Sequence, residues 1–437
     1  MEALQMYRNA LKELIAWKTG SRRKPLVLRG ARQVGKTWLM KELAGKEYDD
    51  SVYISFDKDD DAAKIFSETK DPKLILERLA LIYNKKILPE RTLIILDEIQ
   101  ECPNALGSLK YFNEEANEYH VITAGSLLGT YLAQPASYPV GKVNLQNIYP
   151  LTFEEYLAAA DYGMYQYYGG VRSGKEYVSA FHERMTEHYK KYLIIGGMPE
   201  CVQSWVNNAD PEEISTIQEE IVSLYENDFT KHNNKVNSGR ILQVFRSIVP
   251  QLAKENNEKF MYAAIAKSAR AKDFEDAIEW LVSSGIVCRI LNISKPEYPL
   301  KAYEILNYFK LFLLDAGLLK HLAGLTNKSI LLAEKFQFKG QITENYVLEQ
   351  LMPILPNAPN FYAYAQEREI DFVLQYGETI IPLEVKSGGA QKAVSFKRYI
   401  DKYSPQIAVR LSTKEYLKNG AIINIPLYFT SKVFDLV

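Results

Sequence analysis

The residues best suited to chemistry in this sequence form a glycine-containing stretch, Gly30-Ala31-Arg32-Gln33-Val34-Gly35-Lys36-Thr37, which follows an apolar run and opens a helix-like segment. The two glycines let successive backbone amides point at a polyphosphate near the positive end of the next helix. We therefore expect the residues from Gly30 to Trp38 to bind a nucleotide, with Lys36 on its β- and γ-phosphates and the Thr37 hydroxyl on Mg²⁺. The simpler interpretation is a glycine turn with an exposed lysine.

A second segment carries two acids at the end of an expected strand. Leu93-Ile94-Ile95-Leu96-Asp97-Glu98 is an unbroken apolar run that ends in carboxylates, as expected for a buried parallel strand that delivers them to its C-terminal edge. Asp97 is expected to hold Mg²⁺ and Glu98 to activate water, so nucleotide hydrolysis is the leading interpretation. Such a run is common in α/β proteins and says little alone.

Ser126 follows another expected strand, which covers His120–Ala124. In P-loop ATPases a small polar residue at such a strand end often contacts the attacking water or the γ-phosphate, which makes Ser126 a candidate catalytic sensor. Capping of the next helix by Ser126 explains the residue equally well.

The C-terminal portion places two more carboxylates on one expected hairpin. If Gly377-Glu378 is a two-residue turn, Asp371 lies opposite Glu384, and Lys386 shares their face. Opposed carboxylates can hold Mg²⁺ or Mn²⁺, and an ammonium can position water or stabilise charge during hydrolysis of a phosphodiester. Glu344, near the start of the preceding helix, is a further candidate metal ligand. A salt-bridged, solvated hairpin face explains the same residues without any function.

The chain length of 437 residues is long for a single core. We expect an α/β multidomain protein in four parts: a P-loop NTPase domain with a parallel sheet and flanking helices over 1–160, a tyrosine-rich helical connection over 161–240, a winged-helix-like domain over 241–306, and a small α/β domain over 307–437.

Three helical segments and a hairpin-like pair of strands predict the winged helix. Its expected recognition helix carries four carboxylates between Asp273 and Glu279, which would repel phosphates, and three basic residues between Lys267 and Lys272 offset them only in part. A structural or protein-contacting role is therefore favoured over DNA contact.

The composition excludes several classes of protein. Lys and Arg number 53 against 54 Asp and Glu, so no global basic field attracts nucleic acid. Cys102, Cys201 and Cys288 lie far apart without C-x-x-C spacing, which disfavours a zinc site or a disulfide framework and fits the cytoplasm. Charged residues interrupt the apolar positions of residues 1–20, which excludes a signal peptide, and no stretch reaches transmembrane length. No membrane partner is expected.

Taken together, the motifs resemble those of prokaryotic AAA-superfamily ATPases that pair an N-terminal ATPase domain with a C-terminal DUF4143 region. The resemblance covers nearly the whole chain. Besides the glycine-containing stretch it rests on Leu96-Asp97-Glu98-Ile99-Gln100, Ala124-Gly125-Ser126, Gly196-Gly197-Met198-Pro199, Glu344-Asn345 and Pro382-Leu383-Glu384-Val385-Lys386-Ser387.

The resemblance implies ATP rather than GTP, and a C-terminal domain with a restriction-endonuclease-like, PD-(D/E)xK nuclease fold. It assigns Glu344, Asp371, Glu384 and Lys386 to the metal site of that domain. One departure is Gly141-Lys142-Val143, where the family pattern has arginine, because lysine lacks a bidentate fork.

Two hypotheses follow from these residues. In the first, an ATPase cycle at Lys36, Thr37, Asp97 and Glu98 controls a nuclease-like domain that acts on DNA or RNA. In the alternative, ATP drives a molecular switch whose C-terminal domain binds DNA or a protein partner without cleaving it. The nucleic-acid substrate, assembly into a homo-oligomer and a source for an arginine finger are left open.

Overall fold

The structure is a computed structural model that describes residues 7–125, 141–231, 235–253, 259–265, 269–327, 338–365, 368–388 and 394–437. The described chain forms two compact units. The N-terminal unit comprises Tyr7–Tyr149 together with Ser283–Ile286, and the C-terminal unit comprises Pro150–Val282 and Val287–Val437.

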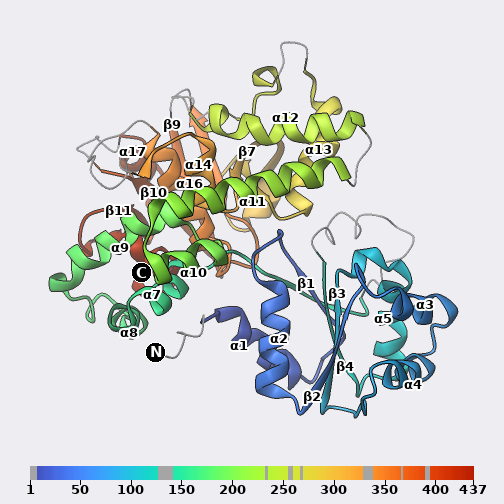
Figure 1. Cartoon of the computed structure of the whole chain (residues 1–437). Coiled ribbons are helices and arrows are strands. Elements are labelled where there is room, and N and C mark those ends of the chain that lie inside the picture. The colour runs from blue at the N-terminus through green and yellow to red at the C-terminus, as the bar shows by residue number, and fades with distance from the viewer. Residues whose placement is uncertain are drawn as a thin grey trace. The chain divides into compact units, whose positions relative to one another are not determined.

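The N-terminal unit is built on a five-stranded parallel sheet with the strand order β2-β3-β4-β1-β5. Figure 1 shows α1 and α2 on one face of this sheet and α3, α4 and α5 on the other. The elements are α1 Asn9–Lys18, β1 Leu26–Arg29, α2 Lys36–Glu47, β2 Asp50–Ser55, α3 Asp60–Glu68, α4 Pro72–Ile82, β3 Thr92–Asp97, η1 Ile99–Glu101, α5 Pro103–Glu115, β4 His120–Ala124 and β5 Asn144–Asn147. The predicted parallel sheet with flanking helices is confirmed.

Burial on both faces explains why most residues of the central strands are apolar. Every residue of β3 and β4 is buried, as expected when helices cover both sides of a parallel sheet. β4 pairs with β1 on one side and with β3 on the other, with Leu28 opposite Ala124 and Leu96 opposite Thr123. The carboxyl ends of these three strands therefore meet at one edge of the sheet.

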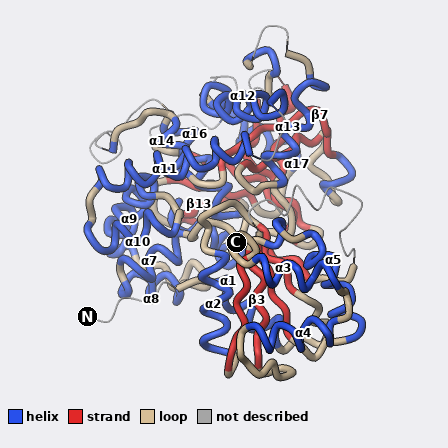
Figure 2. The backbone as a smooth tube through the Cα atoms, turned by 45° about the vertical axis from the view of Figure 1, so that its right-hand side comes forward, coloured by secondary structure: helices blue, strands red, loops and turns tan. Residues whose placement is uncertain are grey.

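The C-terminal unit begins with helices and continues into a mixed sheet, which Figure 2 shows as red strands among blue helices. Its helical elements are α7 Phe153–Ala160, α8 Tyr162–Gly170, η2 Ser179–Phe181, α9 His182–Ile195, α10 Pro199–Asn208, α11 Pro211–Lys231, α12 Lys235–Leu252, η3 Tyr262–Ala264, α13 Ala271–Ser283, η4 Leu300–Tyr303, α14 Ala316–Leu322, α16 Lys339–Leu351, α17 Val394–Tyr403, η5 Leu427–Lys432 and α18 Val433–Leu436. Residues 161–240, where a tyrosine-rich helical connection is expected, contain α8, α9, α10, α11 and the start of α12.

The sheet of this unit has eight strands in the order β12-β13-β11-β10-β9-β8-β6-β7. The strands are β6 Val287–Ile293, β7 Glu304–Leu313, β8 Asn360–Ala365, β9 Arg368–Tyr376, β10 Thr379–Lys386, β11 Ala408–Ser412, β12 Leu417–Asn419 and β13 Ile422–Pro426. The β6–β7 hairpin joins the rest through a parallel pair, Asn292 with Phe361. The hairpin predicted for a winged helix is thus continuous with the C-terminal sheet, and the limit predicted at residue 306 falls inside β7. The winged helix and the domain limits stay predictions.

The Gly196-Gly197 motif has a structural explanation in the core of this unit. The Gly197 amide donates to Oδ2 of buried Asp315 at 2.6 Å, and its carbonyl accepts from the Leu151 amide at 2.6 Å. Gly196 has a φ of +73°, and a Cβ there would overlap the Asp315 carboxylate. Only glycine permits this close approach, because it has no Cβ and tolerates positive φ.

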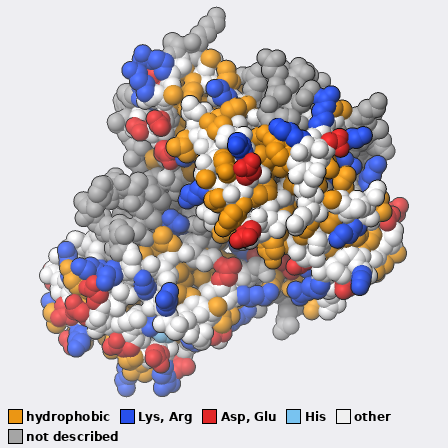
Figure 3. Space-filling model, turned by 180° about the vertical axis from the view of Figure 1, so that it is seen from behind, with side chains coloured by type: hydrophobic (Ala, Val, Ile, Leu, Met, Phe, Trp, Pro, Cys, Tyr) orange, Lys and Arg blue, Asp and Glu red, His pale blue; other side chains and the backbone are white. Residues whose placement is uncertain are grey.

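The surface carries charges of both signs. On the face seen in Figure 3, the Lys and Arg side chains of the described residues are interspersed with Asp and Glu, in agreement with the net charge of −1. No helix among the described residues is long and apolar enough to cross a membrane.

Candidate functional site

The glycine-containing stretch forms a tight loop between β1 and α2. Gly30 has a φ of +145°, and a Cβ there would overlap the carbonyl oxygen of Ile148. Gly35 has a φ of +92° and caps the N-terminus of α2. Because L side chains rarely adopt such angles, both positions require glycine. The loop therefore leaves its backbone amides beside the start of a helix, where anions bind.

Lys36 is the first residue of α2 and is folded back onto the loop. Its Nζ donates to the carbonyl oxygens of Gly30 at 2.8 Å and Ala31 at 2.7 Å. Burial lowers the pKa of Lys36 to about 8, while the negative charges of Glu98 and Asp97 act in the opposite direction. The ammonium is therefore held close to the two predicted acidic residues.

Asp97, at the end of β3, collects three hydrogen bonds. Its Oδ2 accepts from the Thr37 hydroxyl at 2.7 Å and from the Tyr53 hydroxyl at 2.9 Å, and its Oδ1 accepts from the Glu98 amide at 3.1 Å. Asp97 is 4 % exposed. Burial, followed by the charge of Asp97, raises the pKa of Tyr53 to about 12. The predicted pair of Mg²⁺ ligands, Thr37 and Asp97, thus lies within one hydrogen bond although 60 residues separate them.

Glu98 adopts the left-handed conformation, with φ 49° and ψ 43°, which is uncommon for a residue with a side chain and marks a constrained site. Its carboxylate accepts a hydrogen bond from the Gln100 side chain. β4 ends between β1 and β3 at Ala124, whereas Ser126, the predicted sensor, lies outside the described residues.

The remaining residues of the loop differ in exposure. Val34 is fully buried, Gln33 is exposed with a φ of 63°, and Arg32 and Trp38 are half-buried. The positive charge of Arg32 contributes to the lowered pKa of Lys36. Lys142, at the position of the departure from the family pattern, forms an ion pair with Glu114 at 2.7 Å.

Arg8, which the sequence does not indicate as a functional residue, supports the glycine-containing loop through hydrogen bonds to the backbone. Arg8 is 4 % exposed, and its guanidinium donates to the carbonyl oxygens of Val34 at 2.9 Å and Tyr149 at 2.8 Å. The residue just precedes α1, far from the loop in the sequence. Nothing in the local pattern around Arg8 distinguishes it from a surface arginine.

Gly285 was missed as well. Within the N-terminal unit, a Cβ on Gly285 would lie 3.2 Å from the Ala31 amide nitrogen and 3.4 Å from the Gly30 Cα. Its φ is +76°. A turn from later in the sequence thus lies against the start of the loop, where the positive φ and the tight approach favour glycine.

The predicted hairpin of the C-terminal unit is confirmed, with Tyr376 opposite Thr379 and Phe372 opposite Leu383. Continuing this register by one residue places Asp371 opposite Glu384, as expected. Oδ2 of Asp371 accepts from the Val385 amide at 2.6 Å.

Around this hairpin lies a group of acidic and basic side chains that we call the charge cluster. It consists of Lys310 on β7, Glu344 on α16, Glu369 and Asp371 on β9, Glu384 and Lys386 on β10, and Arg410 on β11. The sequence analysis had identified Glu344, Asp371, Glu384 and Lys386, and it missed the other three residues. Lys310 and Arg410 lie on strands that carry none of the predicted residues. Glu369 lies on β9, two residues before Asp371.

Ion pairs join five of the seven residues of the cluster in two separate groups. Lys310 pairs with Glu369, and both side chains are more than nine-tenths buried. Glu384 pairs with Lys386 at 3.1 Å and with Arg410 at 3.0 Å. Oε2 of Glu369 is buried without a hydrogen-bond partner among the described residues.

Burial raises the pKa of Glu344. The pKa of Asp371 is also raised, by burial and by the negative charge of Glu344. Burial also raises the pKa of Glu369 to about 7, against the opposing charge of Lys310. For Lys310 itself burial lowers the pKa, but the charges of Glu369 and Glu344 outweigh burial and raise it. The cluster thus holds several carboxylates that burial and mutual repulsion push towards protonation.

The described residues include no group of three or more His, Cys, Asp or Glu side chains arranged to hold a metal ion. The predicted ligands Glu344, Asp371 and Glu384 are therefore neighbours in one cluster without forming a ready coordination shell. At the N-terminal loop the fit is different, because Mg²⁺ in nucleotide sites needs only one or two protein oxygens beside the phosphates. Thr37 and Asp97 carry oxygens of this kind, 2.7 Å apart.

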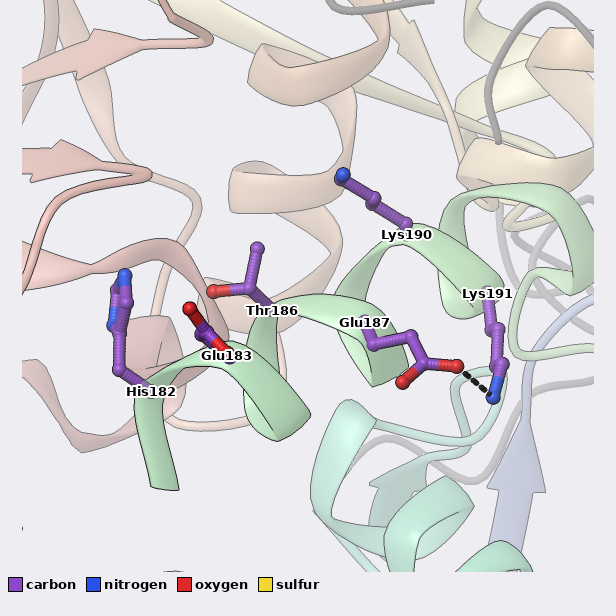
Figure 4. A pocket seen from close by; sticks show the side chains of 6 residues that line it. All are labelled: His182, Glu183, Thr186, Glu187, Lys190 and Lys191. Atoms are coloured by element: carbon purple, nitrogen blue, oxygen red, sulfur yellow. Dashed lines mark ion pairs between the residues drawn. The ribbon is translucent and has the colours of Figure 1, made fainter. Parts of the chain in front are cut away.

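A pocket also lies along α9, away from every predicted residue, and Figure 4 shows its lining, which consists of His182, Glu183, Thr186, Glu187, Lys190 and Lys191. Glu187 pairs with Lys191 at 2.7 Å. The His182 ring nitrogens lie 2.8 Å from the Tyr428 hydroxyl and 3.1 Å from the Thr413 carbonyl oxygen. His182, Glu187 and Lys191 thus make contacts within the unit, and we assign no chemistry to the pocket.

Comparison with protein families identifies three regions. Residues 22–157 match an AAA domain, residues 186–329 match a domain of unknown function, DUF8612, and residues 339–428 match another, DUF4143. The predicted AAA and DUF4143 regions are thus both present. No protein among those of curated function matches the chain.

Among solved structures, the chain is similar to a Walker-type ATPase of Pyrococcus abyssi, with 12 % identity, coverage of 73 % of this chain and 96 % of that one, and a TM-score of 0.44. It is also similar to the Orc1 protein of Aeropyrum pernix, solved in complex with DNA, with 13 % identity, 74 % and 94 % coverage and a TM-score of 0.30. The RuvB Holliday junction branch migration motor of Thermotoga maritima gives 14 % identity, 65 % and 90 % coverage and 0.28. Because all three TM-scores lie below 0.5, these likenesses assign neither a function nor a partner.

Proposed function

We propose that this chain, which combines an AAA domain with a DUF4143 domain, binds ATP with Mg²⁺ at the loop from Gly30 to Trp38 and hydrolyses it. The observation that carries the proposal is the 2.7 Å hydrogen bond between the Thr37 hydroxyl and Asp97. It brings together the hydroxyl and the carboxylate that P-loop enzymes use to hold the ion. When bound, Mg²⁺ neutralises charge on the phosphate oxygens.

Lys36 binds the phosphates in this proposal. Its ammonium now rests on two backbone carbonyls, which are weaker partners than phosphate oxygens because they carry no net charge. Exchange of these carbonyls for the β- and γ-phosphates gives Lys36 a charged partner without a large movement of the helix start.

Glu98 orients and polarises the attacking water. Its carboxylate follows the Mg²⁺ ligand directly, and the Gln100 side chain fixes its direction. A carboxylate at this position can accept a proton from the attacking water. Ser126 completes the proposed set as a sensor of the γ-phosphate.

The test is Mg²⁺-dependent ATP binding and steady-state hydrolysis by the full chain and by Asp97→Asn. We expect the substitution to lower hydrolysis at least about tenfold and to shift the Mg²⁺ dependence to higher concentration, because one ligand oxygen loses its charge. Asp57→Asn is the matched control, since Asp57 is an exposed aspartate just beyond β2. Equal Mg²⁺ dependence in the wild type and Asp97→Asn contradicts the proposal.

A second candidate function concerns the charge cluster. We propose that ATP turnover controls a nuclease-like reaction there on DNA or RNA, with Mg²⁺ or Mn²⁺ held by Glu344, Asp371 and Glu384 and with Lys386 stabilising charge. The orphaned Oε2 of Glu369 favours it, because a buried carboxylate oxygen without a partner needs a cation or a proton. Binding of nucleic acid or protein without cleavage is the alternative.

Cleavage of labelled single-stranded, duplex and branched DNA and of RNA separates these two outcomes. The assay compares wild type with Asp371→Ala, in Mg²⁺ or Mn²⁺, with and without ATP. Cutting that disappears in the variant supports the nuclease. Absence of cutting by a protein that hydrolyses ATP supports the binding module.

A further inference from the structure

Cations of the chain itself occupy both oxygens of Glu384. Oε1 lies 3.1 Å from Nζ of Lys386, and Oε2 accepts from Nε of Arg410 at 3.0 Å. Glu384 is 5 % exposed, so water screens these pairs less than it screens pairs at the surface. A metal ion that binds Glu384 must displace at least one of the two cations.

The sheet fixes Arg410 in this position. β10 and β11 pair in parallel with Glu384 beside Arg410, and the guanidinium lies 5.6 Å from the centroid of the Phe396 ring. The contact therefore exists before any ligand arrives, and little entropy is lost in forming it.

The charges of the whole cluster lead to the same conclusion. Four carboxylates face three cations, which leaves a net charge of −1 when all are ionised. A divalent ion placed beside Lys386 and Arg410 would meet two like charges and would reverse the sign of the total.

We propose that Arg410 is a built-in competitor of a divalent metal ion at Glu384, and that a phosphodiester releases it. Guanidinium binds phosphate oxygens in bidentate fashion, so a phosphodiester can draw Arg410 away from Glu384 and add the negative charge that a divalent ion requires. Metal binding at the cluster then depends on the nucleic acid. This inference rests on the second candidate function.

The experiment measures free Mn²⁺ by electron paramagnetic resonance in titrations of the full chain without nucleotide. Wild type, Arg410→Gln and the double variant Arg410→Gln, Glu384→Gln are compared, and thermal unfolding shows that each is folded. We expect Arg410→Gln to bind Mn²⁺ roughly tenfold or more tightly than wild type, equivalent to about 1.4 kcal/mol. The double variant is expected to lose this gain, which locates the ion at Glu384.

A short thymidine oligonucleotide is then added, with the oligonucleotide alone as control. It is expected to tighten Mn²⁺ binding by wild type and to leave Arg410→Gln nearly unchanged. Equal Mn²⁺ affinity of wild type and Arg410→Gln without oligonucleotide overturns the competitor role, and so does an equal response of both to the oligonucleotide. If Arg410→Gln gains the ion but nothing is cut, the competitor role stands and the cleavage proposal fails. Hydrolysis of ATP by the same wild-type sample tests the N-terminal site independently.

Discussion

The lowered pKa of Lys36 predicts that ATP affinity falls as pH rises from 7 to 9. Burial brings this pKa to about 8, so about 90 % of the lysine is protonated at pH 7 and about 10 % at pH 9. The phosphates bind the ammonium form and raise its pKa in the complex. Apparent affinity should therefore drop roughly tenfold over this interval.

The stability of the nucleotide-free protein is expected to change with pH in the opposite direction to the ATP affinity. A lysine whose folded pKa lies below its unfolded value of 10.5 binds fewer protons when folded than when unfolded, between about pH 8 and pH 10.5. The contribution of Lys36 to the free energy of unfolding therefore increases as pH rises through this window. ATP affinity and the stability of the nucleotide-free protein should change in opposite directions.

Isothermal titration with Mg²⁺-ATP at pH 7, 8 and 9 measures the affinity. Lys36→Arg keeps its charge at every pH and should lose the slope, at lower overall affinity. Lys41→Arg is the control that keeps the wild-type slope, since Lys41 lies over the Tyr53 ring at 4.3 Å on an exposed part of α2. A wild-type affinity that stays constant or rises between pH 7 and pH 9 would refute the reasoning.

Three further substitutions test the supports of the two sites. Arg8→Met removes one buried and one partly buried hydrogen bond of a charged group and should lower the free energy of unfolding by about 3 kcal/mol, measured by urea denaturation; no loss contradicts the supporting role. Gly30→Ala should abolish ATP binding because its Cβ has no space, whereas Gly107→Ala, with nothing within 4 Å of the added Cβ, should leave binding intact; equal binding by both contradicts the loop geometry. Lys310→Met leaves Glu369 without its buried partner and should destabilise the protein by about 3–5 kcal/mol above pH 7 and by less at pH 5, where Glu369 takes up a proton; equal loss at both pH values contradicts the ion pair.

Local pattern was sufficient to predict the glycine-containing loop between β1 and α2. The spacing of Gly30, Gly35 and Lys36 depends on backbone geometry within eight residues, and the apolar run before Asp97 needs only burial on both faces of a sheet. The hairpin register at Asp371 and Glu384 followed from one turn and strict alternation along the strands. Each of these features is encoded within a short segment.

The missed residues share a different property, which is contact over a long separation in sequence. Arg8 reaches Tyr149 across 141 residues, and Gly285 approaches a loop near residue 30. Arg410 joins Glu384 because two parallel strands pair, and parallel pairing has no local turn to fix its register. No pattern around these residues separates them from ordinary surface positions.

The extent of the C-terminal sheet also depends on contacts between residues far apart in the sequence. Helices and a hairpin between residues 241 and 306 predict a winged-helix-like domain, and no local pattern indicates that β6 of this hairpin pairs in parallel with β8. The sequence of a hairpin does not encode which sheet its free edge joins.

Single-turnover hydrolysis of ATP by wild type and Glu98→Gln tests the central claim most directly. Glutamine keeps the shape of Glu98 but cannot accept a proton from water, so we expect ATP to bind the variant and its cleavage to slow by about 10²- to 10⁴-fold. Glu101→Gln, at an exposed glutamate three residues later, should cleave ATP at the wild-type rate. An unchanged rate in Glu98→Gln contradicts the proposed ATPase site.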